Sequence, residues 1–418
     1  MSSFHYVDNE LYAEGVALTE IAREHGTPTY VYSKTDIENA YTAFDEAFSN
    51  HPHLVCYSVK ANSNIAVLNL LAALGAGFDI VSGGELQRVL KAGGDPEKIV
   101  FSGVGKSEQE IRMALQAGIG CFNVESTAEL ELIQRHSAEF NVVAPTSVRV
   151  NPDVDAGTHP YIATGLKENK FGVSRETALE MYRHAAALNN IQMVGIDCHI
   201  GSQITDLDPM LNALGEVLRL VDDLEEEGIA LEHIDLGGGL GICYKDEIPI
   251  PIASYASAVQ LAMGKHKHRL LFEPGRYIVA NAGVLLSRVQ LLKDNNDNHF
   301  AIVDAAMNDL IRPALYNAWQ EVSEVTRKEN AQTWSIVGPV CETGDFLAHK
   351  RELAIEPGDL IAIRSSGAYG FVMSSNYNSR NRAAEVIVTG SQHFCIRQRE
   401  TIEDQLKLER ILPTHSQA

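Results

Sequence analysis

Short apolar runs alternate with amphipathic helical patterns along the chain, and this alternation limits the fold more than any other feature. Eight apolar runs occur between residues 55 and 272: Val55–Tyr57, Phe78–Val81, Ile99–Ser102, Cys121–Val124, Ser147–Val150, Met193–His199, His233–Leu236 and Leu270–Phe272. The helical patterns between them include Gly84–Ala92, Ser107–Ala117, Thr127–His136, Arg175–Ala187 and Met210–Gly228. Eight strand–helix units predict an all-parallel sheet, and their number favours a closed (β/α)8 barrel over an open doubly wound sheet.

After residue 280 helical patterns become rare. The β-rich runs are Val284–Leu292, Ala301–Val303, Trp334–Val337, Leu360–Ile363 and Ala384–Val388, divided by Gly, Pro and Asp turns. They predict a mostly antiparallel β domain, and the early run Tyr30–Ser33 is expected to join its sheet. The expected division is therefore a barrel over 35–280 and a β domain built from 1–34 and 281–418.

Charge and composition narrow the class of protein. The chain has 418 residues and a formal net charge of -21, so no basic patch is expected to bind nucleic acid. The N-terminus does not have the basic and apolar regions of a signal peptide, and no apolar run approaches the ~20 residues that span a membrane. The six cysteines show no CxxC pair or zinc-ligand spacing, which predicts free thiols. A cytoplasmic protein is expected.

Lys60 ends the first apolar run, where a solvated cation is poorly placed. Partial burial would lower the pKa of a lysine there, and a neutral amine is a nucleophile that can form a Schiff base. Taken alone, a strand-end lysine that extends to solvent is the simpler interpretation. The residues at the other strand ends are therefore needed to distinguish a catalytic lysine from a solvated one.

Polar or glycine-rich segments stand at one predicted end of most strands. They are Lys60, Asp79, Arg149 with Asn151, Cys198–Gln203, Gly237–Gly239 and Glu273–Arg276. In a parallel barrel the active site lies at the carboxyl ends of the strands. Core packing does not explain this distribution, so these segments predict an active site.

The segment Asp235–Gly241 contains four glycines directly after a predicted strand. A tight turn explains one glycine more easily than four, whereas exposed backbone N–H groups can cradle a phosphate. A dinucleotide-binding loop is less favoured, because the spacing differs from GxGxxG and the segment is a late unit of the barrel.

His199 and Glu273 extend this set. His199 places a flat ring next to Gly201 and Ser202, whose hydroxyl can serve a phosphate. Glu273 follows an apolar run and precedes a rigid Pro–Gly pair, so its carboxylate can meet a protonated ring nitrogen. Lysine, phosphate cradle, flat ring and carboxylate together predict a pyridoxal-phosphate site.

Four motifs at these strand ends also match a known family. They are Tyr57–Asn62 around the lysine, His199–Gln203, Gly237–Gly239 and Glu273–Arg276. The chain resembles the diaminopimelate decarboxylase family, a branch of the fold-type III pyridoxal-phosphate enzymes that also include ornithine and arginine decarboxylases and alanine racemase. The resemblance runs from Tyr30 to Val388. The cofactor-binding residues expected on these grounds are Lys60, Asp79, Arg149, His199, Ser202, Gly238, Gly239, Glu273, Gly275, Arg276 and Tyr369.

Further segments are similar to substrate-side signatures of that family. They are Thr158–Gly172, Arg312–Tyr316, Cys341–Asp345 and Gly367–Gly370. One residue departs from the pattern: Thr343 stands where the family more often has serine, and it keeps the hydroxyl.

The resemblance implies roles for residues in these segments. Arg276, Arg312 and Tyr316 are expected to hold the distal carboxylate of the substrate, and Glu342 its distal ammonium. Tyr369 is expected to contact both cofactor and substrate. Arginine suits a bidentate carboxylate contact and glutamate suits an ammonium, so the set fits a substrate that is charged at both ends.

The implied reaction is the decarboxylation of meso-2,6-diaminopimelate to L-lysine and CO2, the last step of bacterial-type lysine biosynthesis. Cys341 is expected to protonate the carbanion, with Lys60 as the competing candidate. Shared sites in the family imply a homodimer in which the β domain reaches a second subunit.

Other interpretations remain open at this point. A decarboxylase of ornithine, arginine or carboxynorspermidine would share the cofactor residues and differ in the pocket. A pyridoxal-phosphate carrier would not need Cys341 or Arg312. A racemase would place arginine, not Glu273, against the ring nitrogen. Arg312 could merely begin a helix before a proline, and Cys341 could be a buried apolar thiol.

Overall fold

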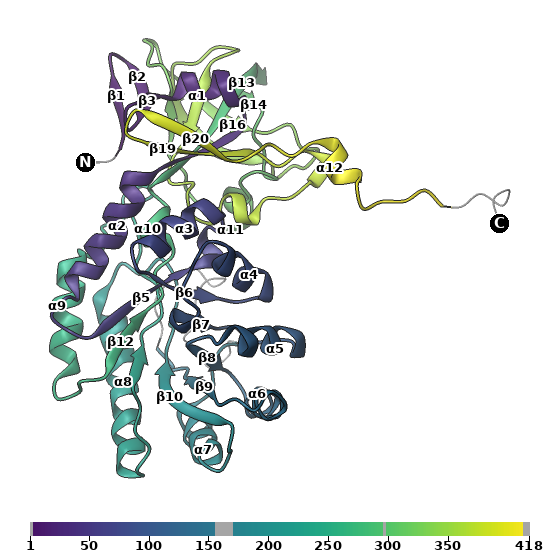
Figure 1. The fold of residues 1–418 in the computed structure, drawn as a ribbon. Coiled ribbons are helices and arrows are strands. Elements are labelled where there is room, and N and C mark those ends of the chain that lie inside the picture. Colours follow the sequence, from purple (N-terminus) through teal and green to yellow (C-terminus); the bar gives the residue numbers. More distant parts are fainter. Residues whose placement is uncertain (1–2, 155–169, 296–297, 413–418) are drawn as a thin grey trace. The chain divides into compact units, whose positions relative to one another are not determined.

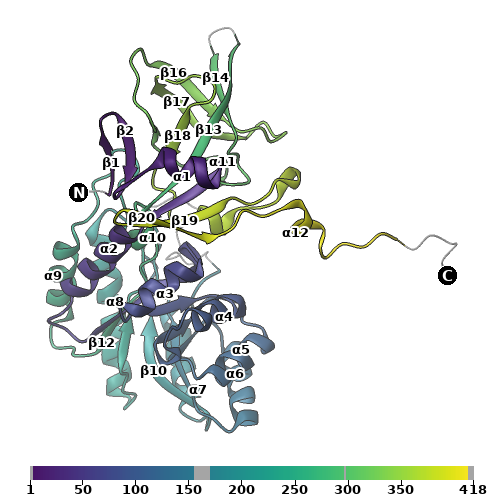
Figure 2. The ribbon, with the colours of Figure 1, turned by 45° about the horizontal axis from the view of Figure 1, so that its top comes forward.

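The computed structural model describes residues 3–154, 170–295 and 298–412. The chain divides into two compact units, here called the barrel unit, Thr35–Asn281, and the β unit, Met1–Lys34 with Ala282–Ala418. Figures 1 and 2 show the ribbon. Of the expected substrate-side loop 158–172, residues 158–169 lie outside the described residues.

The barrel unit contains the predicted closed parallel barrel. Its strands are β5 (His53–Ser58), β6 (Gly77–Ile80), β7 (Ile99–Phe101), β8 (Cys121–Val124), β9 (Ala144–Arg149), β10 (Ile191–Asp197), β11 (His233–Asp235) and β12 (Arg269–Phe272). Each pairs in parallel with the next, and β12 closes the ring on β5. All eight predicted runs are strands of this barrel, and the open-sheet alternative is wrong.

Each strand of the barrel is followed by a helix, and one further helix precedes β5. These helices are α2 (Lys34–Ala47), α3 (Ile65–Ala73), α4 (Gly83–Lys91), α5 (Glu108–Ala117), α6 (Thr127–Phe140), α7 (Arg175–Ala185), α8 (Leu207–Glu226), α9 (Ile252–Met263) and α10 (Arg276–Val279). Serine caps explain where four of them begin, because the side chains of Ser82, Ser107, Ser126 and Ser174 accept backbone N–H bonds from the first turns of α4 to α7.

The β unit has a three-stranded hairpin sheet and a nine-stranded sheet. The hairpin strands are β1 (Phe4–Val7), β2 (Glu10–Ala13) and β3 (Val16–Ala17). The larger sheet contains β4 (Thr29–Ser33), β13 (Gly283–Asn295), β14 (Asn298–Val303), β15 (Val322–Glu324), β16 (Gln332–Val337), β17 (Phe346–Leu353), β18 (Leu360–Ile363), β19 (Ala384–Thr389) and β20 (Gln392–Arg397). The helices of this unit are α1 (Leu18–His25), α11 (Arg312–Tyr316) and α12 (Ile402–Leu406).

Most pairs in the larger sheet are antiparallel, as predicted. The exceptions are β14 with β16 and β4 with β19, which run parallel. The early run Tyr30–Ser33 does join this sheet, because β4 lies between β13 and β19.

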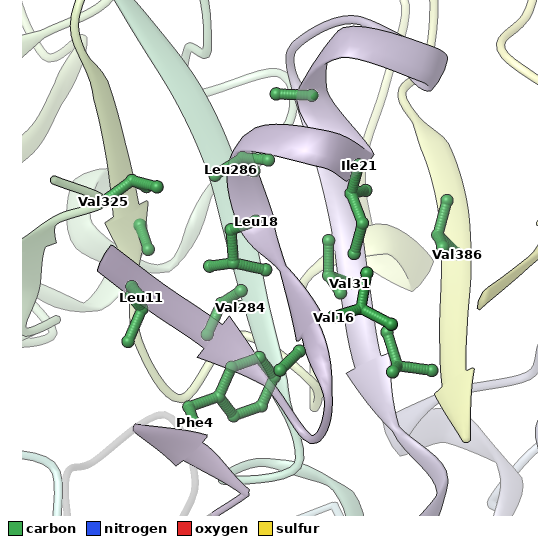
Figure 3. Close-up of a cluster of buried hydrophobic side chains, with 14 residues drawn as sticks. Phe4, Leu11, Val16, Leu18, Ile21, Val31, Val284, Leu286, Val325 and Val386 are labelled. Carbon is green, nitrogen blue, oxygen red and sulfur yellow. The ribbon is translucent and has the colours of Figure 1, made fainter. Parts of the chain in front are cut away.

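The N-terminal segment is held to the larger sheet by an apolar core (Figure 3). Leu18 and Ile21 of α1 are fully buried and pack with Val31 of β4 and Val284 and Leu286 of β13. Burial of such side chains is the main favourable contribution to folding. No helix in the described parts of the chain is long and apolar enough to cross a bilayer.

The core of the β unit can be tested with two leucines of one strand. Leu286 has no exposed surface, whereas 60% of Leu291 is exposed. Leu286→Ala should lower stability by about 2–5 kcal/mol, because it removes a fully buried side chain. The measurement is the urea midpoint of unfolding. Leu291→Ala should shift stability by less than about 0.5 kcal/mol, and equal shifts would contradict this description of the core.

Candidate active site

The carboxyl ends of the barrel strands gather charged and polar side chains. Those that lie within or directly after a strand are Lys60, Asp79, Ser102, Asn123, Glu125, Arg149, Asp197, Asp235 and Glu273. Because all eight strands are parallel, these ends belong to one face of the barrel.

Lys60 lies in a short 3-10 turn, Val59–Ala61, directly after β5. Its Nζ lies 2.7 Å from Asp79 Oδ2 on the neighbouring strand β6. Asp79 is fully buried, and Ser58 Oγ donates a 2.6 Å hydrogen bond to the same oxygen. Burial raises the pKa of Asp79, but attraction to Lys60 and the two hydrogen bonds outweigh it, so the pKa lies below its usual value.

The lysine turn is packed tightly against the segment that follows β12. Ser58 N–H donates to the carbonyl of Pro274 at 3.1 Å. A Cβ on Gly275 would lie 2.9 Å from the Cβ atoms of both Ser58 and Ala61. Only glycine allows this approach, which explains the Glu–Pro–Gly–Arg motif beside the lysine motif.

Three buried acids lie close together under this face. Oxygen atoms of Asp197, Asp235 and Glu273 all lie within 4.8 Å of one another. Burial, and then the charge of Asp235, raise the pKa of Glu273 well above its usual value. Burial also raises the pKa of Asp235 to about 6 and that of Asp197 well above normal. The raised pKa values favour retention of protons in this cluster, and a cation that enters the site would offset the repulsion between its carboxylates.

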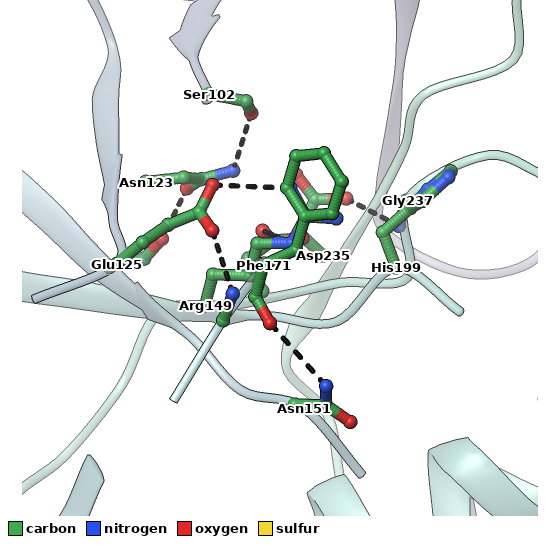
Figure 4. A network of polar contacts seen from close by, with 12 residues as sticks. Ser102, Asn123, Glu125, Arg149, Asn151, Phe171, His199, Asp235 and Gly237 are labelled. Carbon is green, nitrogen blue, oxygen red and sulfur yellow. Dashed lines mark hydrogen bonds and ion pairs between the residues drawn. The ribbon is translucent and has the colours of Figure 1, made fainter. Parts of the chain in front are cut away.

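Arg149 is the buried cation beside these acids (Figure 4). It lies 3.3 Å from Glu125 and 3.8 Å from Asp197, and its guanidinium lies over the ring of Phe171 at 4.9 Å. Burial lowers the pKa of Arg149, but the attraction of the acids outweighs burial and raises it. The arginine is therefore a permanent charge that orients Glu125 and Asp197.

His199, which follows β10, is held by the glycine loop after β11. Gly238 N–H donates to His199 Nδ1 at 3.0 Å, so this nitrogen carries a lone pair. Burial, together with Arg149 and Lys60, lowers the pKa of His199 to about 3. The ring is therefore neutral, with its proton on Nε2.

The loop needs glycines because neighbouring atoms lie very close to its backbone. Gly237 has a φ of +62°, and a Cβ there would lie 2.5 Å from His199 Nδ1. A Cβ on Gly238 would lie 2.3 Å from the Glu273 carbonyl oxygen, and one on Gly239 2.8 Å from that of Gly201. The loop is thus fixed between the ends of β10 and β12.

Ser202 and Arg276 are also brought together. Arg276 begins α10, is buried, and donates from Nη2 to Ser202 Oγ at 2.9 Å and from Nη1 to Tyr244 Oη at 2.7 Å. A hydroxyl, a guanidinium and the backbone of the glycine loop are the groups that a phosphate needs.

The remaining predicted residues belong to the β unit. Arg312 begins α11 before Pro313, as the helix-start interpretation expects, but it is also buried and donates to Gln320 Oε1 at 2.8 Å. Tyr316 ends the same helix and is half-buried. Tyr369 has a φ of +55°, a conformation that is costly for a bulky residue and is found mostly at functional sites.

Cys341 and Glu342 lie on an exposed turn of the β unit. Asp345 holds this turn, because its side chain accepts from Val340 N at 2.8 Å and Met307 N at 2.7 Å. Cys341 N–H donates to Asn378 Oδ1 at 3.0 Å. The interpretation of Cys341 as a buried apolar thiol is wrong.

The sequence prediction missed several members of the barrel network. Asp197 and Asp235 were not predicted as site residues, nor were Asn123 and Glu125. Their signal was present, since each stands at or just after the carboxyl end of a strand. Asp235 was noticed only as the start of a glycine loop.

The role of Gly237 in holding His199 can be tested with an alanine. Gly237→Ala should push the ring aside and weaken pyridoxal-phosphate binding by about tenfold or more, or ~1.4 kcal/mol. Gly118→Ala is the matched control, because Gly118 has a similar φ of +68° with nothing within 4 Å of an added Cβ. Both variants should lose stability from backbone strain, by about 1–2 kcal/mol. Equal cofactor affinity in the two variants, measured by equilibrium titration, would contradict this account.

Comparison with known proteins gives a consistent result. Residues 34–280 match the family model of the pyridoxal-dependent decarboxylases, pyridoxal binding domain. The chain is 59% identical to the diaminopimelate decarboxylase of Pseudomonas fluorescens over 99% of its own length and 100% of that protein.

Solved structures agree with this match. The diaminopimelate decarboxylase of Helicobacter pylori, in complex with L-lysine, superposes with a TM-score of 0.91 at 43% identity and covers 94% of this chain and 98% of its own. That of M. jannaschii, also with L-lysine, gives 0.94 at 39% identity over 98% of both chains. The chain therefore belongs to the diaminopimelate decarboxylase family of pyridoxal-dependent decarboxylases.

Proposed function

We propose that this chain is a pyridoxal-phosphate-dependent carboxy-lyase that converts meso-2,6-diaminopimelate to L-lysine and CO2. The observation that carries the proposal is the 59% identity to a diaminopimelate decarboxylase along nearly the whole chain. The L-lysine bound to two structural relatives is the product of this reaction.

The barrel residues fit the cofactor. Lys60 is an amine at the mouth of the barrel, Glu273 a buried acid and His199 a neutral flat ring. When bound, pyridoxal phosphate supplies an electron sink for the electrons that the departing carboxylate leaves behind. In this proposal Lys60 binds the carbonyl carbon, Glu273 the ring nitrogen and His199 the ring face.

The other predicted cofactor contacts divide by chemistry. The phosphate would be held by Ser202, Gly238, Gly239, Gly275 and Arg276. Asp79 and Arg149 would contribute indirectly. Asp79 would hold the Lys60 amine, and Arg149 would hold the buried acid Asp197. Tyr369 would be contributed by the β unit.

Glu273 is suited to keep a ring nitrogen protonated. Burial, and then the charges of Asp235, Asp79 and Asp197, raise the pKa of Glu273 well above its usual value, which favours a carboxyl group with a proton to give. Transfer of that proton to a ring nitrogen would create a cation beside several buried acids, which stabilises the charge. Ser102 Oγ donates to Glu273 Oε1 at 3.2 Å and fixes the carboxyl group.

Asp79 is placed to hold and orient the Lys60 amine. The 2.7 Å contact already joins the amine to a buried carboxylate. Asp79 Oδ1 is buried and has no hydrogen-bond partner among the described residues. This oxygen can accept one further hydrogen bond, while the lowered pKa of Asp79 favours the charged carboxylate beside Lys60.

The β unit would recognise the distal end of the substrate. In this proposal Arg312, Tyr316 and Arg276 hold its carboxylate and Glu342 its ammonium, while Cys341 returns the proton at the carbon that has lost CO2. Gln320 orients the Arg312 guanidinium, because Arg312 Nη1 donates to Gln320 Oε1 at 2.8 Å, and a guanidinium suits a bidentate contact with a carboxylate. The exposure of Cys341 and Glu342 supports their use by a second subunit in a homodimer, and sedimentation that shows an active monomer would contradict this.

We propose a cytoplasmic location. It is supported by the six cysteines, which form no disulfide, as is usual for proteins of a reducing compartment.

Substrate choice tests both the reaction and the role of Arg312. The wild type should release CO2 from meso-diaminopimelate and far more slowly from ornithine, arginine or carboxynorspermidine. Arg312→Lys keeps the charge but loses the bidentate fork, so kcat/KM for meso-diaminopimelate should fall by about 10- to 100-fold, or ~1.5–3 kcal/mol. Arg327→Lys, at an exposed position of the same unit, is the control.

The outcomes separate the two claims. Faster CO2 release from one of the other substrates would overturn the proposed function. Normal preference for meso-diaminopimelate with equal kinetics in both arginine variants would leave the function standing and remove Arg312 from the site.

A further inference from the structure

Two histidines meet two carboxylates at the amino end of β12, away from the strand ends described above. His266 and His268 lie in the short segment between α9 and β12. Their ring centroids are 5.8 Å apart. Asp222 and Glu225 lie three residues apart on one face of α8, near its C-terminal end.

The side chains approach one another without forming hydrogen bonds. His266 Nε2 lies 3.7 Å from Asp222 Oδ1, and His268 Nε2 lies 3.6 Å from Glu225 Oε1. Both distances exceed those of N–H···O hydrogen bonds. One donor atom each from Glu225, His266 and His268 lies within 4.8 Å of the others. Such spacing leaves room for an ion between them.

Both imidazoles are largely buried, with only 7% and 10% of the His266 and His268 side chains exposed. His268 Nδ1 is buried without a hydrogen-bond partner among the described residues. His51 Nε2 lies 2.9 Å from the His268 carbonyl oxygen and fixes the backbone there. Buried imidazole nitrogens without a partner are costly unless something binds them.

The surroundings favour a cation. The site opens to a hollow of about 360 Å³ that is lined by Glu232 and also by the exposed Lys265 and Lys267. The last turn of α8 carries carbonyl groups with partial negative charge, and the helix spans 20 residues (Figure 1). Lys265 Nζ lies 2.7 Å from Asp222, but 72% of this lysine side chain is exposed, so it can move away at little cost.

We propose that His266, His268 and Glu225 form a binding site for a divalent transition-metal ion of the zinc type, with Asp222 as an additional oxygen ligand. Two imidazoles with carboxylates match the donors that Zn²⁺ and Co²⁺ accept. The site lies at the amino ends of the barrel strands, where residues serve stability and not catalysis. The ion therefore stabilises the barrel unit and takes no part in decarboxylation.

Metal titration of the full-length holoenzyme tests the proposal. After chelator treatment and removal of the chelator, the wild type should bind one Co²⁺ per chain with visible d–d absorption, and Zn²⁺ should displace it. The His266→Gln and His268→Gln variants should each bind at least tenfold more weakly. His25→Gln is the matched control, because His25 lies in a separate cluster with Glu24 and His393.

A second readout separates this site from the catalytic one. Zn²⁺ should raise the melting temperature of the wild type and of His25→Gln, but not that of the His266→Gln/His268→Gln double variant. CO2 release should not change when the site is filled. Equal metal affinity in the double variant and the wild type, or no saturable binding by the wild type, would overturn the proposal.

Protection from chemical modification tests the site in the wild type, so it does not depend on whether a variant folds. In the wild type, Zn²⁺ should slow diethylpyrocarbonate modification of His266 and His268 and leave that of His25 unchanged, as mapped by mass spectrometry. Equal modification of His266 and His268 with and without Zn²⁺ would also overturn the proposal.

Discussion

The contact between Lys60 and Asp79 is the interaction on which the rest of the barrel site depends. A fully buried carboxylate is costly unless a cation and hydrogen bonds compensate it, and Lys60 and Ser58 supply both. The same contact fixes the amine at the strand end. Gly275 then allows the segment that carries Glu273 to pack against the lysine turn.

The site holds more buried acid than buried base. Asp79, Asp197, Asp235 and Glu273 are all buried, and burial, with repulsion from neighbouring acids as a smaller cause, raises the pKa values of the last three. Arg149 compensates part of this charge. The excess of acid makes the barrel receptive to a protonated ring, which is the chemical requirement of the proposed cofactor.

Much of the fold was predictable because its signals are local. Every predicted barrel strand exists, and the serine-capped helices begin where their caps indicate. Several of the missed elements have weak patterns: α9 is built largely of small and apolar residues, β17 is interrupted by His349 and Lys350, and β20 is an edge strand without a buried residue. The partners of β4 could not be predicted strand by strand, because they are more than 250 residues away.

The candidate site was predictable where a residue type is unusual for its position, as for Lys60 or the glycine loop. Asp197 and Asp235 were missed because a single acid at a strand end has an ordinary explanation. Their importance arises only from their distance to Glu273, which the parallel pairing of β10, β11 and β12 sets. The substrate-side residues rest on resemblance, since Arg312 begins α11 and Cys341 lies on a separate turn, and no local pattern connects the two.

The most direct measurement of the central claim is the position at which the cofactor is attached. The holoenzyme is reduced with borohydride, digested and mapped by mass spectrometry, with Lys60→Ala treated in parallel. The account predicts a pyridoxyl group on Lys60 Nζ and none in the variant. A pyridoxyl group on another lysine of the wild type, or the same amount of label in the variant, would contradict it.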